Sequence, residues 1–236
     1  MLVPRSNGTL SVPVELPPRV AVFFCSLMPP RFVVFDFDGT LADSMPFFLE
    51  NLDAVARTHG FRSFAPEDLP ALRRMSTREL MAHVGLPWWK LPRVSRDFRQ
   101  RMRASAHRIA LFPDVPRMLA TLAQQVPVGI VTSNSQANVE AILGDAMAHV
   151  AVGEYAAAFL GKTGRLRRIC RRAGVAPEAS IYIGDEERDI AAARASGMRS
   201  GAVSWGYAAE EAIRAAQPDH VFLDRDDLVT QLLRAA

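Results

Sequence analysis

The sequence predicts an α/β protein whose core is a parallel sheet with helices on both faces. Five short apolar runs, typical of buried strands, alternate along the chain with segments of helical spacing, and this alternation is the pattern of a parallel sheet. Polar clusters stand where the strands are expected to end, at the edge where such sheets bind ligands. One long stretch, 44–111, breaks the alternation with helical patterns alone, which indicates an insertion after the first strand.

The elements of the core are predicted from the spacing of their apolar residues. The first strand, 32–35, is apolar at every position and runs into the turn sequence Asp36-Phe37-Asp38-Gly39-Thr40. The other strands are expected at 126–131, 180–183, 200–204 and 220–222. The helices of the core are expected at 114–125, 136–143, 162–173, 187–196, 208–216 and 225–235.

The domain organisation follows from the insertion. A chain of 236 residues has room for one domain with a large insertion or for two small domains. We expect an α/β core formed by residues 28–43 and 112–236, a helical cap formed by residues 44–111, and an N-terminal extension, residues 1–27, outside the main fold. The cap carries twelve basic and six acidic residues, a net charge of +6, whereas the whole chain carries +3.

Composition and charge exclude several classes of function. A net charge of +3 is too small for a nucleic-acid-binding surface, and the apolar run 20–28 is far shorter than the roughly 20 residues that span a bilayer. Cys25 and Cys170 form neither a disulfide framework nor a metal-ligand spacing, which favours a reducing, cytoplasmic setting. We therefore expect no nucleic-acid partner and no membrane, and a monomer or a homodimer.

The strongest chemical signal is the pair Asp36 and Asp38. Side chains at positions i and i+2 of an extended segment point to the same side, so both carboxylates can face one site, while Gly39 frees the backbone to turn. Two carboxylates this close repel each other unless they share a proton or a cation. A turn or a helix cap would need only one of them. The pair therefore predicts a site that holds a divalent metal, which also neutralises a phosphate.

Asp36-Phe37-Asp38-Gly39-Thr40 resembles the first motif, D-x-D-G-T, of the phosphatases in the haloacid dehalogenase-like (HAD) superfamily. Three further motifs match in order, and the resemblance covers about residues 32–234. It implies a HAD-like core with a Rossmann-like sheet and a cap inserted after the first strand. The chain is most similar to the phosphoglycolate phosphatase and β-phosphoglucomutase branch of that superfamily.

The resemblance also implies roles for residues at the other strand ends. Thr132, which ends an apolar run, matches the second motif, and with Ser133 and Asn134 it would hold the phosphoryl group, as free amides at a strand–helix turn suit an anion. Lys162 matches the third motif. The helix dipole disfavours a lysine at the start of a helix, so a nearby carboxylate and phosphate would explain its place.

The fourth motif, G-D-x-x-x-D, is matched by the stretch from Gly184 to Asp189. By resemblance Mg²⁺ is held by the carboxylates of Asp36 and Asp185 and by the main-chain carbonyl of Asp38, whereas Thr40 and Asp189 support the site. Asp36 would attack phosphorus to form an aspartyl phosphate, Lys162 would stabilise the phosphoryl oxygens, and Asp38 would act as general acid and base.

The resulting expectation is a Mg²⁺-dependent phosphomonoester hydrolase that acts on a small phosphorylated metabolite, as a phosphoglycolate phosphatase does. A sugar-phosphate mutase shares all four motifs and stays an alternative. A non-catalytic phospho-acceptor signalling domain is disfavoured by the cap and by Asp38. A dehalogenase is disfavoured because that branch lacks an aspartate at the position of Asp38.

Arg78 is the predicted specificity residue of the cap. It lies in Met75-Ser76-Thr77-Arg78-Glu79-Leu80, which is similar to a stretch that places an arginine over the active site in the β-phosphoglucomutase branch. A guanidinium offers a planar fork for a carboxylate or a phosphate at the far end of a substrate.

Overall fold

The computed structural model describes residues 28–156 and 161–233. Six parallel strands form one sheet in the order β5-β4-β1-β6-β7-β8. Their bounds are β1 Phe32–Phe35, β4 Val128–Val131, β5 Val152–Glu154, β6 Ser180–Gly184, β7 Arg199–Val203 and β8 His220–Phe222. The predicted parallel α/β sheet and its five strands are confirmed, and β5 is a sixth strand that the sequence did not indicate. The predicted extension 1–27, with Cys25, and the end of the last helix lie outside the described residues.

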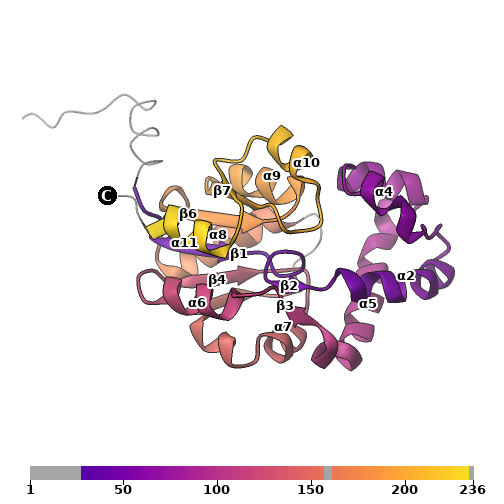
Figure 1. Cartoon of the computed structure of the whole chain (residues 1–236), viewed down its shortest axis with the longest axis horizontal. Helices are drawn as coiled ribbons and strands as arrows, with labels where there is room; N and C mark the ends of the chain where they lie inside the picture. The colour runs from indigo at the N-terminus through magenta and orange to yellow at the C-terminus, as the bar shows by residue number, and fades with distance from the viewer. Residues whose placement is uncertain (1–27, 157–160, 234–236) are drawn as a thin grey trace, which may run out of the picture.

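Helices cover both faces of the sheet (Figure 1), because alternate side chains of a strand point to opposite faces. Val33 and Phe35 of β1 belong to a buried cluster with α6, α7 and α11, whereas Phe32 and Val34 belong to a second cluster with α8 and α9. The core helices are α6 Val115–Ala123, α7 Gln136–Leu143, α8 Lys162–Ala173, α9 Glu187–Ser196, α10 Glu210–Ala215 and α11 Arg225–Leu233.

The segment between β1 and α6 forms a group of helices beside the carboxyl ends of the strands (Figure 1). The helices are α2 Met45–His59, α3 Leu69–Leu72, α4 Thr77–Val84 and α5 Leu91–Ser105. They have an apolar cluster of their own, which includes Val55, Val84 and Val94. Short 3₁₀ helices occupy Pro66–Asp68, Trp88–Lys90, Ala106–Arg108, Gly144–His149 and Pro177–Ala179.

The expectation of helix throughout 44–111 is wrong at its end. β2 Ala42–Asp43 pairs antiparallel with β3 Ala110–Leu111, so the chain enters and leaves the helical group through a two-stranded ribbon. The physical reason is that the two connections run side by side, and the amide of Phe112 donates to the carbonyl of Leu41 at 3.0 Å. This ribbon holds both ends of the inserted segment close to the loop that follows β1.

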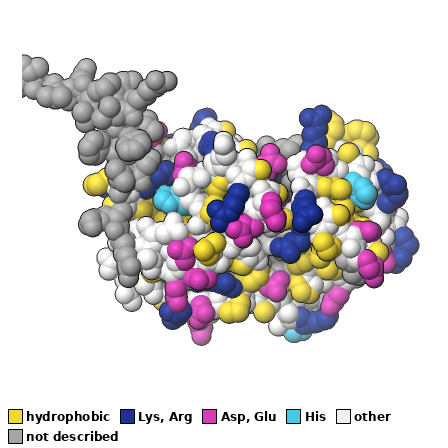
Figure 2. All heavy atoms as spheres, turned by 45° about the horizontal axis from the view of Figure 1, so that its top comes forward, with side chains coloured by type: hydrophobic (Ala, Val, Ile, Leu, Met, Phe, Trp, Pro, Cys, Tyr) yellow, Lys and Arg dark blue, Asp and Glu magenta, His cyan; other side chains and the backbone are white. Residues whose placement is uncertain are grey.

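On the face that Figure 2 shows, acidic and basic side chains are intermixed and form no large patch of one charge. None of the helices in the described ranges has the length and apolar character needed to cross a bilayer.

Candidate active site

The loop after β1 carries the first two functional residues, Asp36 and Asp38. The carbonyl of Phe37 accepts bonds from the amides of Thr40, Leu41 and Ala42, which closes the loop tightly on itself. Gly39 has a φ of 80° and a Cβ there would lie 2.3 Å from the Asp185 carboxylate, so both the turn and the close approach require glycine. The turn thereby brings the end of β1 against the end of β6.

Lys162, at the start of α8, lies between two carboxylates. Its Nζ is 2.5 Å from Oδ2 of Asp36 and 2.6 Å from Oδ1 of Asp189, and all three side chains are buried. Burial by itself would lower the pKa of Lys162, but Asp189 and Asp36 outweigh it and raise the pKa. Burial raises the pKa of Asp36 to about 6 against the opposing effect of Lys162. The lysine therefore stays charged and holds the Asp36 carboxylate in a fixed orientation.

Three carboxylates gather at this strand edge. Oxygens of Asp36, Asp185 and Asp189 all lie within 4.8 Å of one another. Burial, and then repulsion from Glu186, Asp189 and Asp36, raise the pKa of Asp185 well above its ordinary value. Lys162 contacts Asp36 and Asp189 of this cluster, whereas Asp185 accepts bonds from neutral donors. An oxygen-ligated divalent cation fits such a donor set. The predicted ligands Asp36 and Asp185 are thus together.

The orientation of Asp185 is set by two donors from different parts of the chain. Thr40 Oγ1 donates to Oδ1 at 3.2 Å, and the amide of Tyr207 donates to Oδ2 at 2.8 Å. Thr40 therefore supports the carboxylate that was predicted to bind the metal. Asp189 contacts Lys162 at 2.6 Å, beside the site that it was expected to support.

Asp38 has a different environment, and its carboxylate is not part of the acidic cluster. Ser44 Oγ donates to Oδ1 at 2.7 Å, and Nδ2 of Asn134 donates to Oδ2 at 3.2 Å. Burial raises the pKa of Asp38 even though the bonds from Ser44 and Asn134 oppose this. A carboxyl group with a raised pKa, held by neutral donors, is suited to exchange a proton. The side chain thus fits an acid and base better than a metal ligand.

The loop after β4 places the predicted phosphate-binding residues at the same edge. Thr132 is fully buried, and its Oγ1 accepts from the amide of Asn134 at 3.0 Å. The Asn134 side chain bonds Asp38, and its Oδ1 accepts from Asn138 at 2.9 Å. Asn134 therefore lies beside Asp38, and its main-chain amide connects it to the hydroxyl of Thr132.

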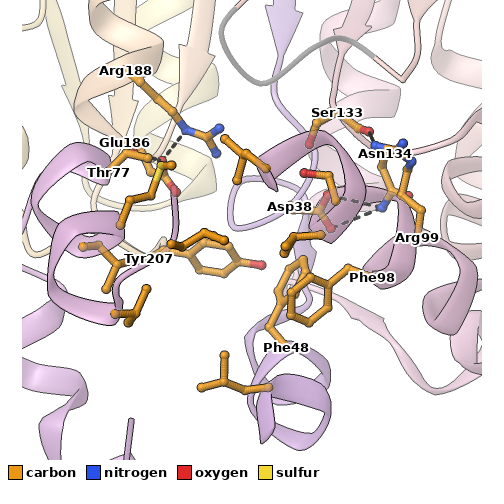
Figure 3. Close-up of a pocket in the computed structure, with 18 of the residues that line it drawn as sticks. Asp38, Phe48, Thr77, Phe98, Arg99, Ser133, Asn134, Glu186, Arg188 and Tyr207 are labelled. Carbon is orange, nitrogen blue, oxygen red and sulfur yellow. Dashed lines mark hydrogen bonds and ion pairs between the residues drawn. The ribbon is translucent and has the colours of Figure 1, made fainter. Parts of the chain in front are cut away.

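A cavity of about 290 Å³ opens over this edge. Its floor includes Asp36, Asp38 and Asn134, and its walls come largely from α2, α4 and α5 (Figure 3). The apolar part of the wall comes from the helical group and contains Phe48, Leu52, Phe61, Phe64, Leu80, Met81, Val84, Leu86, Leu91, Val94, Phe98 and Met102. The reacting end of the cavity is thus charged, whereas the rest is mostly apolar.

Comparisons with known proteins agree with this geometry. Residues 33–203 match the model of the haloacid dehalogenase-like hydrolase family. The chain belongs to this family. It is 34% identical to the phosphoglycolate phosphatase of Synechococcus elongatus over 86% of this chain and 98% of that protein, and 33% identical to the phosphoglycolate phosphatase of Xanthomonas campestris over 86% and 93%. The predicted family and the prediction of a phosphatase enzyme are confirmed.

Solved structures show the same HAD-like fold. A protein described as a phosphoglycolate phosphatase from Lactobacillus plantarum has a TM-score of 0.73 at 24% identity. The match covers 86% of this chain and 100% of that one. A protein described as a β-phosphoglucomutase from Thermotoga maritima has a TM-score of 0.59 at 18% identity, covering 86% and 98%. At these identities the likeness is one of fold.

The predicted specificity residue of this HAD-like protein, Arg78, does not line the cavity. It is exposed on α4, although its neighbour Thr77 lines the wall. The physical reason is the position of α4: its N-cap is Ser76, and the face that carries Thr77, Leu80 and Met81 is the one turned to the cavity. The arginines that line the cavity are Arg99 and Arg188.

Sequence reasoning missed four polar residues at the site: Ser44, Arg99, Arg188 and Tyr207. Ser44 is the N-cap of α2, yet its hydroxyl bonds Asp38 and lies 2.5 Å from the Tyr207 hydroxyl instead of capping the helix. A serine four residues beyond the turn sequence 36–40 is an ordinary cap signal. Only the position of Tyr207, over a hundred residues away, reveals the second use.

Proposed function

We propose that this HAD-like protein hydrolyses phosphomonoesters with Asp36 as nucleophile and Asp38 as general acid and base. The observation that carries the proposal is the difference between the two aspartates of one turn. Asp36 belongs to the acidic cluster and is held by Lys162 at 2.5 Å. Asp38 accepts hydrogen bonds from neutral donors at the floor of the same cavity. The relatives named as phosphoglycolate phosphatases support a small phosphorylated substrate and make 2-phosphoglycolate the first one to test.

The reaction has two steps. A carboxylate oxygen of Asp36 forms a bond to phosphorus, the bond from phosphorus to the alcohol oxygen breaks, and Asp38 gives that oxygen its proton. A water molecule then attacks phosphorus, Asp38 takes its proton, and the bond to Asp36 breaks to release inorganic phosphate. Lys162 and the main-chain amide of Ser133, which follows Thr132, would stabilise the phosphoryl oxygens.

Asp36 and Asp185, with the main-chain carbonyl of Asp38, would hold Mg²⁺ in this proposal. When bound, Mg²⁺ supplies positive charge that screens the repulsion between the nucleophile and the phosphate. The buried acidic cluster supports this role, because the carboxylate of Asp185, within 4.8 Å of Asp36 and Asp189, is repelled by both. The helices within 44–111 would act as the cap that encloses the substrate and excludes bulk water.

The test is an assay of inorganic phosphate released from p-nitrophenyl phosphate, 2-phosphoglycolate and a panel of sugar phosphates with Mg²⁺. We expect one phosphate for each alcohol released. Conversion of one sugar-phosphate isomer into another without release of phosphate would establish the mutase instead. The absence of turnover on every substrate in the panel would contradict the proposed hydrolysis.

A further inference from the structure

Arg99 connects the helical group to the loop after β4, at the floor of the cavity. It lies on α5, lines the cavity, and is half-buried. Its Nη1 donates to the carbonyl oxygen of Ser133 at 3.0 Å, which places the guanidinium directly over the loop after β4. A guanidinium has five N–H donors in a planar fork, so one bond to a carbonyl leaves donors available for another acceptor.

The charge of Arg99 has no carboxylate within ion-pair distance among the residues of 28–156 and 161–233. The other arginine of the cavity, Arg188, is paired with Glu186, and Arg101 on the same helix is paired with Asp97 at 2.8 Å. Burial, and then repulsion from Arg96, lower the pKa of Arg99. An anion placed beside Arg99 would therefore relieve an unfavourable charge.

The position of Arg99 relative to the two aspartates decides which part of a substrate it meets. Asn134, next to Ser133, donates to Asp38, the residue that would protonate the leaving oxygen. Figure 3 shows Arg99 beside Ser133 and Asn134, with Arg188 across the cavity. Arg99 therefore lies on the side of Asp38, where the alcohol part of the substrate departs.

The rest of the cavity favours a strong ion pair at this point. Phe48, Phe98, Leu80 and Met81 line the cavity and offer no polar atom other than a thioether sulfur. Apolar walls lower the local dielectric constant, and a charge pair in such surroundings is stronger than one in water. A negative group on the alcohol part would find in Arg99 its natural counter-ion.

We propose that Arg99 is a specificity residue that binds an oxyanion, a carboxylate or a second phosphate, on the alcohol part of the substrate. The inference rests on the proposed phosphomonoester hydrolysis and deepens it. It assigns to Arg99 the role that the sequence had suggested for Arg78, and it predicts that preferred substrates carry a second negative group close to the scissile phosphate.

The test compares matched substrates in wild-type protein and in Arg99→Met. 2-Phosphoglycolate carries a carboxylate where 2-hydroxyethyl phosphate has a neutral hydroxymethyl group, and ethanediol bisphosphate carries a second phosphate. We expect Arg99→Met to lower kcat/KM roughly 10–100-fold for the preferred substrate with a second negative group, the loss of one charge-assisted contact. The value for 2-hydroxyethyl phosphate should change less than about 3-fold. A larger loss on 2-phosphoglycolate identifies the group bound by Arg99 as a carboxylate, and a larger loss on ethanediol bisphosphate identifies it as a phosphate. An equal loss on all three substrates would overturn the proposal, because it would place Arg99 on the phosphoryl group or in closure of the helical group.

Two controls keep the result specific to the guanidinium. Arg103→Met removes an exposed arginine one turn further along α5 and is expected to leave every kcat/KM unchanged. Arg99→Lys keeps the charge without the planar fork and is expected to give an intermediate loss on the substrate with a second negative group.

A binding measurement separates this inference from the proposed function. Calorimetric titration of the intact protein with glycolate in the presence of inorganic phosphate is expected to show binding that Arg99→Met weakens at least about 10-fold. If wild-type protein hydrolyses nothing yet glycolate binding depends on Arg99, the proposed hydrolysis fails and the inference about Arg99 stands. If glycolate binds wild-type protein and Arg99→Met equally, the inference is overturned whatever the turnover.

Discussion

At the scale of single residues, the site shows how one turn gives two aspartates different chemistry. Asp36 faces an ammonium at 2.5 Å and two further carboxylates, which keeps it in place as an anion when a cation is bound. Asp38 accepts hydrogen bonds from the hydroxyl of Ser44 and from the side-chain amide of Asn134, which hold it without supplying a full opposite charge. The partners of each aspartate, more than its place in the motif, account for the proposed division of roles.

Asp36→Asn is expected to lower kcat by roughly 10³-fold or more, because the amide keeps the shape but loses the nucleophilic charge. Lys162 retains its bond to Asp189 at 2.6 Å, so the melting temperature should stay within a few degrees of that of wild type, roughly the effect of less than 1 kcal/mol. Steady-state kinetics on p-nitrophenyl phosphate and a thermal melt of the same sample provide the measurement. Retention of more than a few per cent of kcat, about 5%, would remove Asp36 from its role.

The residues that sequence reasoning found and missed differ in one physical respect. Asp36, Asp38, Lys162, Asp185 and Asp189 stand at fixed offsets from strand ends or helix starts, so a short pattern places them at one edge of the sheet. Arg99 is one of several arginines on α5, and nothing in its spacing separates it from them. The way the whole helix packs over the loop after β4 decides which arginine reaches the cavity.

At the scale of elements, burial on both faces made β1 and β4 easy to predict. β1 and β4 are apolar and buried at every position. β5 was missed because Val152-Gly153-Glu154 is short and polar at its end, the composition of an edge strand. Its Glu154 accepts bonds from Arg165 and Arg172 at 3.0 Å each. The arginine-rich face of α8 therefore attaches that helix to the sheet edge.

The loop after β7 supports the acidic cluster through Gly206. A Cβ at Gly206 would lie 2.1 Å from Cβ of Asp185 and 2.7 Å from the carbonyl oxygen of Gly39. Gly206→Ala is therefore expected to displace Asp185 and to destabilise the protein by about 1–3 kcal/mol. The Mg²⁺ concentration that half-activates the enzyme should rise at least several-fold, roughly 5-fold or more for a shift of about 1 kcal/mol at the ligand. Thermal melts and Mg²⁺ titrations of activity measure both effects.

Gly164→Ala is the matched control for that variant. Nothing lies within 4 Å of a Cβ at Gly164, which stands in the first turn of α8, and alanine there is expected to stabilise the protein by about 0.5–1 kcal/mol. An equal change in melting temperature and in Mg²⁺ activation for both variants would show that the close packing at Gly206 is unimportant.

At the scale of the whole molecule, the site is assembled from distant segments that the fold brings together. The guanidinium of Arg73, in the inserted segment, donates to the carbonyls of Tyr207 and Gly206 at 2.8 and 3.0 Å, and Thr77 donates to Glu186 at 3.3 Å. These bonds hold the helical group against the loop that supports Asp185 and against Glu186 at the start of α9. The shape of the cavity therefore depends on how the inserted helices pack against these loops as much as on the sheet.

Because the acidic cluster joins the ends of β1 and β6 and the start of α9, a bound divalent cation should stabilise the folded molecule as a whole. The cluster has its short distances only in the native state, so a cation binds that state and not the unfolded chain. At about 100 times its Kd, Mg²⁺ is expected to add about 2.7 kcal/mol and to raise the melting temperature by roughly 5–10 °C over the value in EDTA. Asp185→Asn should abolish most of this shift.

Ca²⁺ should separate the stabilising effect of a cation from its effect on activity. It accepts 6–8 oxygens and tolerates a bidentate carboxylate, so it can engage both oxygens of Asp36 and leave none free to attack phosphorus. We expect Ca²⁺ to raise the melting temperature as Mg²⁺ does and to inhibit turnover competitively with Mg²⁺. Thermal melts and phosphate-release assays in EDTA, Mg²⁺ and Ca²⁺ measure both. Full activity in EDTA, or with Ca²⁺ alone, would contradict the metal site formed by Asp36 and Asp185.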